Sequence, residues 1–361
     1  MRRYKVLGIV AVVVALMGAT AYVALHRAGA DTPDVGVLEL PRGGTMPDAD
    51  IDRDGTLHVA FMIDQDVYYA RGSGRPLVLG PPVRINQQAG TALGGMFRGP
   101  ELAIAGDGSV DVVWYRRGWE MKLPPAEEGP MFSRRLPQGG FSAARRVFDR
   151  PTDGHSITTT SDGLLLAWKA GPSLWSMTSR DAGASFEAAL DLGPLPCECC
   201  DTALAAGSDG VAYLAYRDRK DDIRDVFLLP LQGGVATRER LRLDDESWHF
   251  DGCPHSGMSL AVRDHSVYAV WEHIGSILLT RIDADRWSRL PPVRVTGFGK
   301  YPVIATDGAT LLVAWKERKV LVWALYDART LEVLRGGKAD SSSSSRPAAV
   351  SLRDGTYVLI A

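Results

Sequence analysis

Three of the four cysteines of this 361-residue chain lie in one short segment, Cys197-Glu198-Cys199-Cys200-Asp201. The fourth, Cys253, lies two residues before His255. Thiols form disulfides in an oxidising compartment, and thiolates are also ligands for soft metal ions. These two segments therefore have two interpretations, and the sequence leaves both open.

In the first interpretation two disulfides pin two loops, each contributing about 2–4 kcal/mol, and no cofactor is required. Four cysteines allow three connectivities, and the sequence does not choose between them. In the second, the thiolates bind a soft metal such as copper(I), with His255 as a further ligand. The spacing differs from the paired Cys-x-x-Cys pattern of structural zinc sites. Both interpretations predict that Cys253 lies close to Cys197, Cys199 or Cys200, with Cα atoms within ~7 Å.

Arginines form the second group of candidate residues, since a guanidinium binds carboxylates and phosphates through two parallel hydrogen bonds. We expect Arg98, Arg116 and Arg217 to face an acidic ligand, with Asp201 and His255 nearby. Arg217 also belongs to a set of residues that each directly follow an aromatic residue late in a predicted strand. The set is Met62, Tyr115, Lys169, Arg217, Glu272 and Lys316. We interpret its members either as solvated strand ends or as an anion-binding ring at a channel mouth.

The elements that position these residues come from a repeat. Predicted hairpin turns recur every 43 to 55 residues, at Asp54-Gly55, Asp107-Gly108, Asp162-Gly163, Asp209-Gly210, Asp264-His265, Asp307-Gly308 and Asp354-Gly355. Asp-Gly between alternating apolar runs is a strong hairpin signal, because glycine tolerates the positive φ of a tight turn. An alternating strand follows and reaches an aromatic residue at Phe61, Trp114, Trp168, Tyr216, Trp271 and Trp315. This period and pattern are typical of a β-propeller.

We therefore expect an all-β fold, a seven-bladed propeller over residues 31–361, with six blades plus an irregular N-terminal unit as the alternative. The last copy, residues 347–361, stops after two strands. Residues 35–40 read as an isolated strand that would complete this blade and remove its exposed edge. Residues 124–130 and 339–346 are predicted as loops.

Residues 1–30 are predicted to be a signal peptide or a membrane anchor helix. Arg2, Arg3 and Lys5 precede an uncharged stretch over residues 6–25, and Ala28-Gly29-Ala30 follows as a cleavage site. The stretch also approaches the roughly 20 residues that span a bilayer. Both interpretations place the remainder outside the cytoplasm, as a periplasmic or secreted protein or one anchored to the membrane by residues 6–25. The net charge of −2 argues against a nucleic-acid partner.

One motif resembles a known family. Ser179, Asp181, Gly183, Ser185 and Phe186 fit the pattern Ser-x-Asp-x-Gly-x-Ser/Thr-aromatic, which resembles the Asp-box (BNR repeat) of the sialidase superfamily. In that family the Asp-box is a structural turn between the outer strands of a blade, so the resemblance implies the fold rather than a catalytic role.

A second motif is similar to the aromatic-Arg-Ile-Pro motif of the same family. Phe97-Arg98-Gly99-Pro100 carries Gly99 in place of the isoleucine. The resemblance implies that Arg98 binds the carboxylate of a sialic acid. No tyrosine with a glutamate partner matches the family's nucleophile at a corresponding position.

These observations predict an exported, sialidase-like β-propeller that binds an acidic or glycan-type ligand at the channel mouth. An exo-sialidase-type glycoside hydrolase is one alternative, with its catalytic residues unknown. An extracytoplasmic thiolate module for copper is the other. The expected partners are a small-molecule or glycan ligand and, if the N-terminal segment is uncleaved, the membrane.

Overall fold

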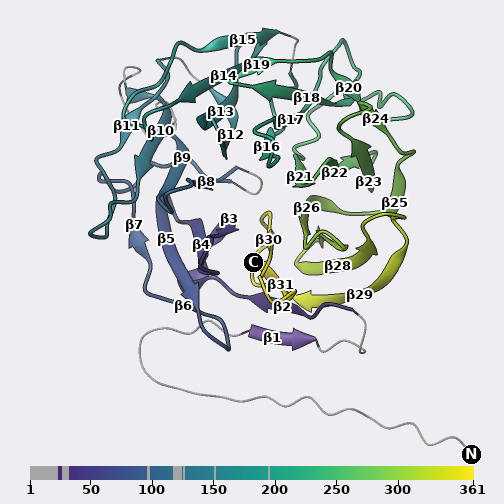
Figure 1. The fold of residues 1–361 in the computed structure, drawn as a ribbon, viewed down its shortest axis with the longest axis horizontal. Helices are drawn as coiled ribbons and strands as arrows, with labels where there is room; N and C mark the ends of the chain where they lie inside the picture. Colours follow the sequence, from purple (N-terminus) through teal and green to yellow (C-terminus); the bar gives the residue numbers. More distant parts are fainter. Residues whose placement is uncertain are drawn as a thin grey trace, which may run out of the picture.

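The computed structural model describes residues 32–95, 98–116, 124, 127–149, 152–193 and 196–361, together with the backbone of residues 23–26. Strands within these residues form seven sheets around a central channel (Figure 1). The chain is therefore an all-β, seven-bladed propeller, as predicted, and the six-bladed alternative is wrong. The one helical element whose bounds lie within these residues is a short 3-10 turn, η1 (Pro41–Gly43).

The first three blades follow one another along the chain. Blade one contains β3 (Thr45–Ile51), β4 (Leu57–Ile63), β5 (Asp66–Ser73), β6 (Val78–Leu79) and β7 (Val83–Arg84). Blade two contains β8 (Glu101–Ile104), β9 (Val110–Arg116), β10 (Gly129–Arg134) and β11 (Arg145–Arg146). Blade three contains β12 (Asp153–Thr160), β13 (Gly163–Ala170), β14 (Ser173–Ser179) and β15 (Leu190–Gly193).

The other four blades complete the ring. Blade four contains β16 (Ala203–Ala206), β17 (Ala212–Arg217), β18 (Val226–Gln232), β19 (Val235–Ala236) and β20 (Leu241–Arg242). Blade five contains β21 (Met258–Arg263), β22 (Ser266–His273), β23 (Ser276–Asp283), β24 (Ser288–Arg289) and β25 (Val293–Thr296). Blade six contains β26 (Lys300–Thr306), β27 (Thr310–Glu317), β28 (Val320–Asp327) and β29 (Val333–Asp340). Blade seven contains β30 (Ala348–Ser351), β31 (Tyr357–Ile360), β2 (Val35–Leu38) and β1 (Val23–His26).

All seven predicted turns join the first and second strands of a blade. In the turn between β3 and β4, the Asp52 carboxylate accepts hydrogen bonds from the backbone N–H groups of Asp54 and Thr56, at 2.9 and 2.8 Å. Gly55 has a φ of 83°, a left-handed conformation that a residue with a side chain seldom adopts. These local features therefore position the turn between the first two strands of the blade.

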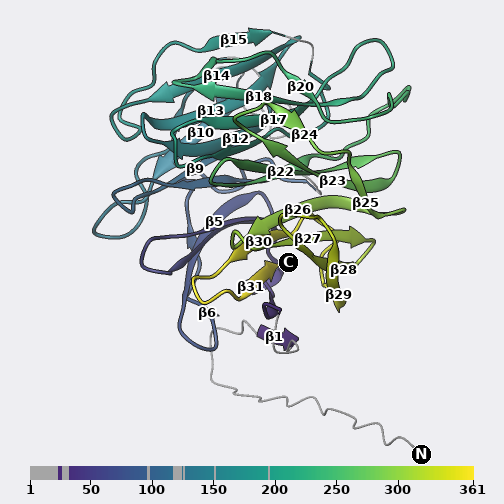
Figure 2. The same cartoon turned by 45° about the vertical axis from the view of Figure 1, so that its right-hand side comes forward.

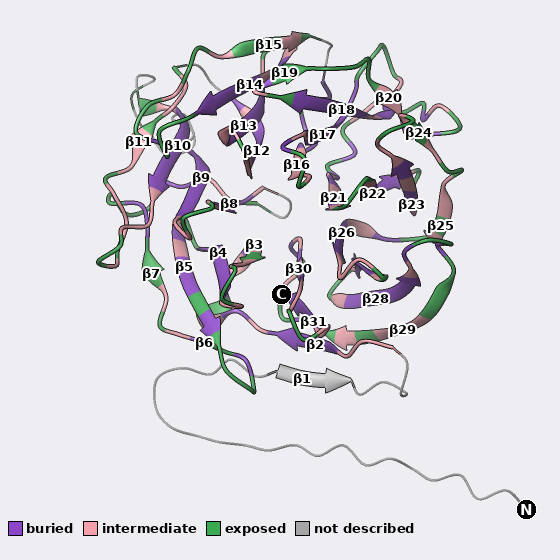
Figure 3. Cartoon of the chain, in the orientation of Figure 1, coloured by how far each residue is buried: buried purple, intermediate pink, exposed green. Residues whose placement is uncertain are grey.

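The six predicted aromatic residues are all buried on second strands. Seven hydrophobic clusters each join the facing sheets of two adjacent blades. One of them packs Tyr213 and Ala215 of blade four against Val267 and Trp271 of blade five. Figure 3 shows this buried layer in the middle strands, with exposed residues concentrated in the peripheral strands and loops. The core is therefore distributed between the blades, and each blade depends on its neighbours.

The ring closes as predicted, between the two ends of the described chain. Strand β2 pairs in parallel with β31, and Leu40 N–H donates to the Ala361 carbonyl at 3.1 Å. Strand β30 lies between β26 of blade six and β3 of blade one (Figures 1 and 2). Strand β1, which overlaps the end of the predicted apolar segment, pairs with β2 on the outside.

The rest of the predicted signal or anchor segment lies outside the described residues. Among the described residues, no helix has the length and apolar character that crossing a bilayer requires.

Two loop boundaries were wrong. Strand β10 begins at Gly129, inside the predicted loop 124–130, and β29 extends to Asp340, inside the predicted loop 339–346. Proline and serine in these segments suggested loops, but pairing with a neighbouring strand overrides such local preferences.

Candidate thiol site and central channel

Two loops on one face of the propeller carry the four cysteines. The first precedes β16 of blade four and is tied to β17 by a hydrogen bond from Cys197 N–H to the Arg217 carbonyl, at 2.8 Å. The second precedes β21 of blade five and is tied to the β17–β18 connection by a bond from Arg224 N–H to the Trp248 carbonyl, also at 2.8 Å. Because blades four and five are neighbours, the two loops lie side by side.

The thiols converge where these loops meet. The sulfurs of Cys197, Cys199 and Cys200 all lie within 4.8 Å of one another. A second triad, in which the same limit holds, consists of the Cys199 sulfur, the Cys253 sulfur and a ring nitrogen of His255. The Cys253 sulfur therefore lies close to the Cys199 sulfur, and the Cα separation of ~7 Å or less stays a prediction.

All four cysteines are free thiols in the structure. The sulfurs of Cys197 and Cys199 lie 3.5 Å apart, whereas a disulfide bond is about 2.05 Å long. Disulfide pairing in an oxidising environment therefore stays a prediction. Burial is the largest of the effects that raise the pKa of the Cys200 thiol. For Cys199, the hydrogen bond with Cys197 would lower the pKa, but the one with Cys200, together with burial, raises it to about 12.

Lys169, at the end of β13, holds the first loop in place. Its ammonium group donates hydrogen bonds to the carbonyl oxygens of Cys197, at 2.9 Å, and Glu198, at 3.2 Å. A further bond goes to the Cys200 carbonyl. The side chain is buried, so these contacts satisfy both the charge and the loop carbonyls. Lys169 therefore fixes the backbone from which three thiols project.

Other charged residues of the set that follows the aromatics share this role, and the prediction of solvated strand ends is wrong. All six are buried. Lys316 donates to Ser341 Oγ at 2.6 Å and to the Ser343 carbonyl at 3.0 Å, in the loop before β30. Glu272 accepts two bonds of 2.8 Å from Lys300, in the first strand of blade six. These side chains therefore bind the backbone or side chains that lead into the next blade.

The predicted anion-binding arginines already have partners within the protein. Arg98 forms an ion pair with Asp153 at 2.7 Å, and Arg116 forms one with Glu127 at 2.6 Å. The buried Arg217 donates to the backbone carbonyls of Arg224 and Glu272, both at 2.7 Å, and its guanidinium lies 4.7 Å from the centre of the Trp248 ring. The structure thus gives Arg217 a structural contact between the two loops, and a ligand-binding role for the three arginines stays a prediction.

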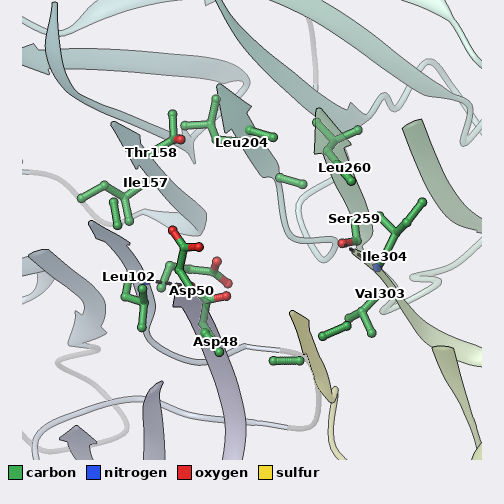
Figure 4. A pocket seen from close by; sticks show the side chains of 18 of the residues that line it. Asp48, Asp50, Leu102, Ile157, Thr158, Leu204, Ser259, Leu260, Val303 and Ile304 are labelled. Atoms are coloured by element: carbon green, nitrogen blue, oxygen red, sulfur yellow. Dashed lines mark hydrogen bonds between the residues drawn. The ribbon is translucent and has the colours of Figure 1, made fainter. Parts of the chain in front are cut away.

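The central channel contains a cavity of about 390 Å³ lined by the innermost strands. Carboxylates from blades one and two line it, and Figure 4 shows Asp48 and Asp50 of β3 beside Leu102 of β8. Arg346 donates to the Glu101 carboxylate at 2.5 Å. Burial raises the pKa of Asp48 and Asp50 to about 6 and that of Glu101 to about 8, although Arg346 opposes the shift for Asp48 and Glu101.

Asp201 and His255, both predicted to bind a ligand, lie in different surroundings. Asp201 is buried, and burial raises its pKa to about 7 against the opposing charges of Arg346 and Lys169. It therefore belongs electrostatically to the channel carboxylates. His255 is exposed beside Cys253, with a φ of 51°. Its backbone N–H interacts with the Cys199 sulfur, which links the two loops directly.

The Asp-box forms the structural turn that the resemblance implied, between β14 and β15. Asp181 accepts hydrogen bonds from Ser185 Oγ at 2.5 Å, from Ser185 N–H at 2.8 Å and from Ser179 Oγ at 2.9 Å, and these bonds lower its pKa to about 2. Phe186 packs edge-on against Phe132 with ring centres 5.3 Å apart. The motif lies at the blade periphery, away from the channel.

Comparisons with known proteins support the fold alone. No protein-family model matches the sequence, and no curated protein matches it. Among solved structures, hydrazine synthase of Kuenenia stuttgartiensis matches with a TM-score of 0.55 and 11% identity, over 85% of this chain and 90% of that chain. The periplasmic gluconolactonase of Pseudomonas aeruginosa matches with a TM-score of 0.55 and 15% identity, over 83% of this chain and 86% of that one.

A leech intramolecular trans-sialidase matches with a TM-score of 0.51 and 10% identity, over 83% of this chain and 68% of that chain. Proteins of different function thus share the architecture at low identity. The class that these likenesses define is the β-propeller, and the sialidase resemblance extends to the fold rather than to a shared activity.

Proposed function

We propose that this protein is an extracytoplasmic copper(I)-binding β-propeller, whose metal site is formed by the loops before blades four and five. The observation that carries the proposal is the convergence of four thiols and one imidazole from two loops about 50 residues apart. Free thiols gathered in this way bind soft metal ions once they lose their protons.

The arrangement favours copper(I) over zinc. Structural zinc sites are tetrahedral and need four ligands, and each of the two triads offers three. The first triad consists of three thiols, so all its donors are sulfur atoms. Because all three cysteines are buried, the triad also excludes water. An all-thiolate, water-poor set of three donors suits a soft monovalent ion.

The surrounding residues keep the donors in position. Lys169 fixes the first loop through three carbonyl groups, and Arg217 stacks on Trp248 of the second. Such support reduces the reorganisation that metal binding requires. The extracytoplasmic location is part of the proposal, and its support is the basic N-terminus followed by the apolar stretch.

The test is copper retention against a competing chelator. Protein purified without oxygen would be loaded with copper(I), exposed to excess bathocuproine disulfonate and analysed for bound copper and zinc. We expect the wild type to retain copper and the Cys197→Ser/Cys200→Ser variant to lose it. His249→Ala is the matched control, because His249 is an exposed histidine of the second loop that pairs with Asp222 instead. Loss of all copper from the wild type, or equal retention of zinc, would refute the proposal.

The acidic or glycan ligand has weaker support. Arg98, Arg116 and Arg217 are all bound to acceptors within the protein, so an anionic ligand would have to displace them. We expect no hydrolysis of a fluorogenic sialoside above the rate of a heat-denatured sample. Turnover that survives the cysteine substitutions would favour the glycosidase alternative.

A further inference from the structure

The five donors of the thiol site form two overlapping triads rather than one compact set. Cys197 and Cys200 belong only to the first triad, Cys253 and His255 belong only to the second, and Cys199 belongs to both. A single ion bound at either triad would use three donors and leave two unused. A thiolate sulfur, in contrast, has enough lone pairs to bind two soft ions at once.

We propose that the site holds two copper(I) ions bridged by the sulfur of Cys199. The inner ion is bound by Cys197, Cys199 and Cys200, and the outer ion is bound by Cys199, Cys253 and His255. This inference rests on the proposed function and goes beyond it by assigning the number of ions and the bridging ligand.

The proton balance follows from the shared ligand. Binding of the inner ion releases the protons of three thiols to solvent. Binding of the outer ion releases only the proton of Cys253, because Cys199 is already a thiolate and His255 binds as a neutral imidazole.

The charges of the site accommodate two ions. With the inner ion alone, three thiolates and one copper(I) ion carry a net charge of −2, while Cys253 keeps its proton. The outer ion brings one positive charge and displaces one thiol proton, so the net charge stays at −2, and two buried cations adjoin the cluster. Lys169 binds the carbonyls of the thiolate-bearing loop, and Arg217 acts electrostatically on Cys200. The cluster and its surroundings then approach neutrality, which a buried site requires.

The two positions differ in access to solvent. The inner ligands are buried, whereas Cys253 and His255 are exposed. An incoming thiol can therefore replace the ligands of the outer ion without opening the loops. The inner ion has no such route, so we expect it to exchange more slowly with external chelators.

The number of bound ions tests the inference. Copper per chain would be measured after stepwise anaerobic loading and removal of unbound copper by gel filtration, and again after chelator challenge, for the wild type, Cys253→Ser/His255→Ala and His249→Ala. The count before the challenge gives the number of bound ions. We expect two ions in the wild type and in His249→Ala, and one in the double variant. X-ray absorption should show a short copper–copper scattering path in the wild type that the double variant lacks.

The possible results separate the two proposals. One ion in the wild type, unchanged in the double variant, would overturn the bridged pair and leave the copper function intact. No retained copper would overturn the function itself. Two ions without a copper–copper path would mean separate sites and would also overturn the bridge. Circular dichroism and thermal unfolding of the metal-free variants would verify that each is folded.

Discussion

Lys169 and Lys316 occupy the same place in blades three and six, and both bind the loop that leads into the next blade. Only the Lys169 loop carries thiols. Substituting each lysine in turn therefore distinguishes an effect on the stability of the fold from an effect on the proposed metal binding.

We expect Lys169→Met and Lys316→Met to lower the melting temperature by similar amounts, because each leaves buried acceptors without a donor, at a cost of about 1–3 kcal/mol per group. Only Lys169→Met should also speed the loss of copper to a chelator. Thermal unfolding and chelator kinetics on both variants measure the two effects. Equal rates of copper loss would contradict the positioning role of Lys169.

A second prediction at this scale concerns pH. The native pKa of Asp48 is about 6, above its ordinary value of 3.8, because burial disfavours the charged form. Such a group stabilises the fold fully below its unfolded pKa, and this contribution is lost as the pH rises through the native pKa. Asp201 and Glu101 shift in the same direction, to about 7 and about 8.

We therefore expect the melting temperature of the metal-free protein to fall from about pH 4 to about pH 8. Asp48→Asn should flatten the part of this fall up to about pH 6, because asparagine does not titrate. Asparagine can still accept the hydrogen bond from Leu102 N–H, which is 2.7 Å long, so the local structure is kept. Thermal unfolding across a pH series provides the measurement. Parallel profiles for wild type and variant would show that Asp48 does not contribute.

For individual residues, the sequence predicted which side chains come together better than it predicted what each side chain does. The meeting of Cys253 with Cys199 followed from the repeat, which makes blades four and five neighbours. The functions of Lys169 and Arg217 did not follow, because their partners are backbone carbonyls in other segments. The overlap of two triads at Cys199 depends on side-chain positions, which spacing along the chain does not specify.

The turns are the elements that the sequence specified most directly. Glycine at positive φ and an aspartate side chain that binds the following backbone are local features, so they can be identified without tertiary contacts. Strand β10 was placed too late because its edges depend on pairing with β9 across a long connection. Local chemistry therefore predicts the turns more accurately than it predicts the strand limits.

Two of these glycines provide a prediction. Gly163 has a φ of 121°, and an added Cβ would overlap the carbonyl oxygen of Ser179, whereas Gly108 has a φ of 82° and no atom within 4 Å of an added Cβ. Gly108→Ala should cost only the left-handed strain of about 1–2 kcal/mol. Gly163→Ala should cost clearly more, because the backbone must also move. Chemical denaturation compares them, and equal losses would contradict the steric account.

For the whole molecule, closure of the ring depends on β2. Deleting residues 31–41 should lower the melting temperature markedly, since β31 would lose its parallel partner and present an open edge. Leu38→Ala tests how much the packing of β2 contributes to stability, because Leu38 is 0% exposed. Truncating a buried leucine to alanine lowers the free energy of unfolding by about 2–5 kcal/mol. Leu334→Ala, at a residue 43% exposed, is the control and should have little effect. An unchanged melting temperature after the deletion would mean that the ring closes in another way.

Export is the second prediction for the whole molecule. Cleavage after Ala30 would produce a mature protein that begins near Asp31, partitions into the soluble fraction and keeps β2 while losing β1. An uncleaved segment would hold the protein on membranes after a high-salt wash, because salt screens charges but does not extract a spanning segment. N-terminal sequencing of the exported form distinguishes the two. A cytoplasmic pool with all four thiols reduced would contradict the extracytoplasmic location.

The parallel pairing of β2 with β31 also sets an order of events in folding. Residues at opposite ends of the chain, Val35 and Tyr357, must meet to close the ring, and contacts so distant in sequence form slowly. The thiol loops, in contrast, belong to consecutive blades and need only residues from about the middle of the chain. The proposed metal ligands can therefore assemble on a partly folded chain before its ends have met. A copper ion captured at that stage would fix blades four and five as a folding nucleus to which the remaining blades are added.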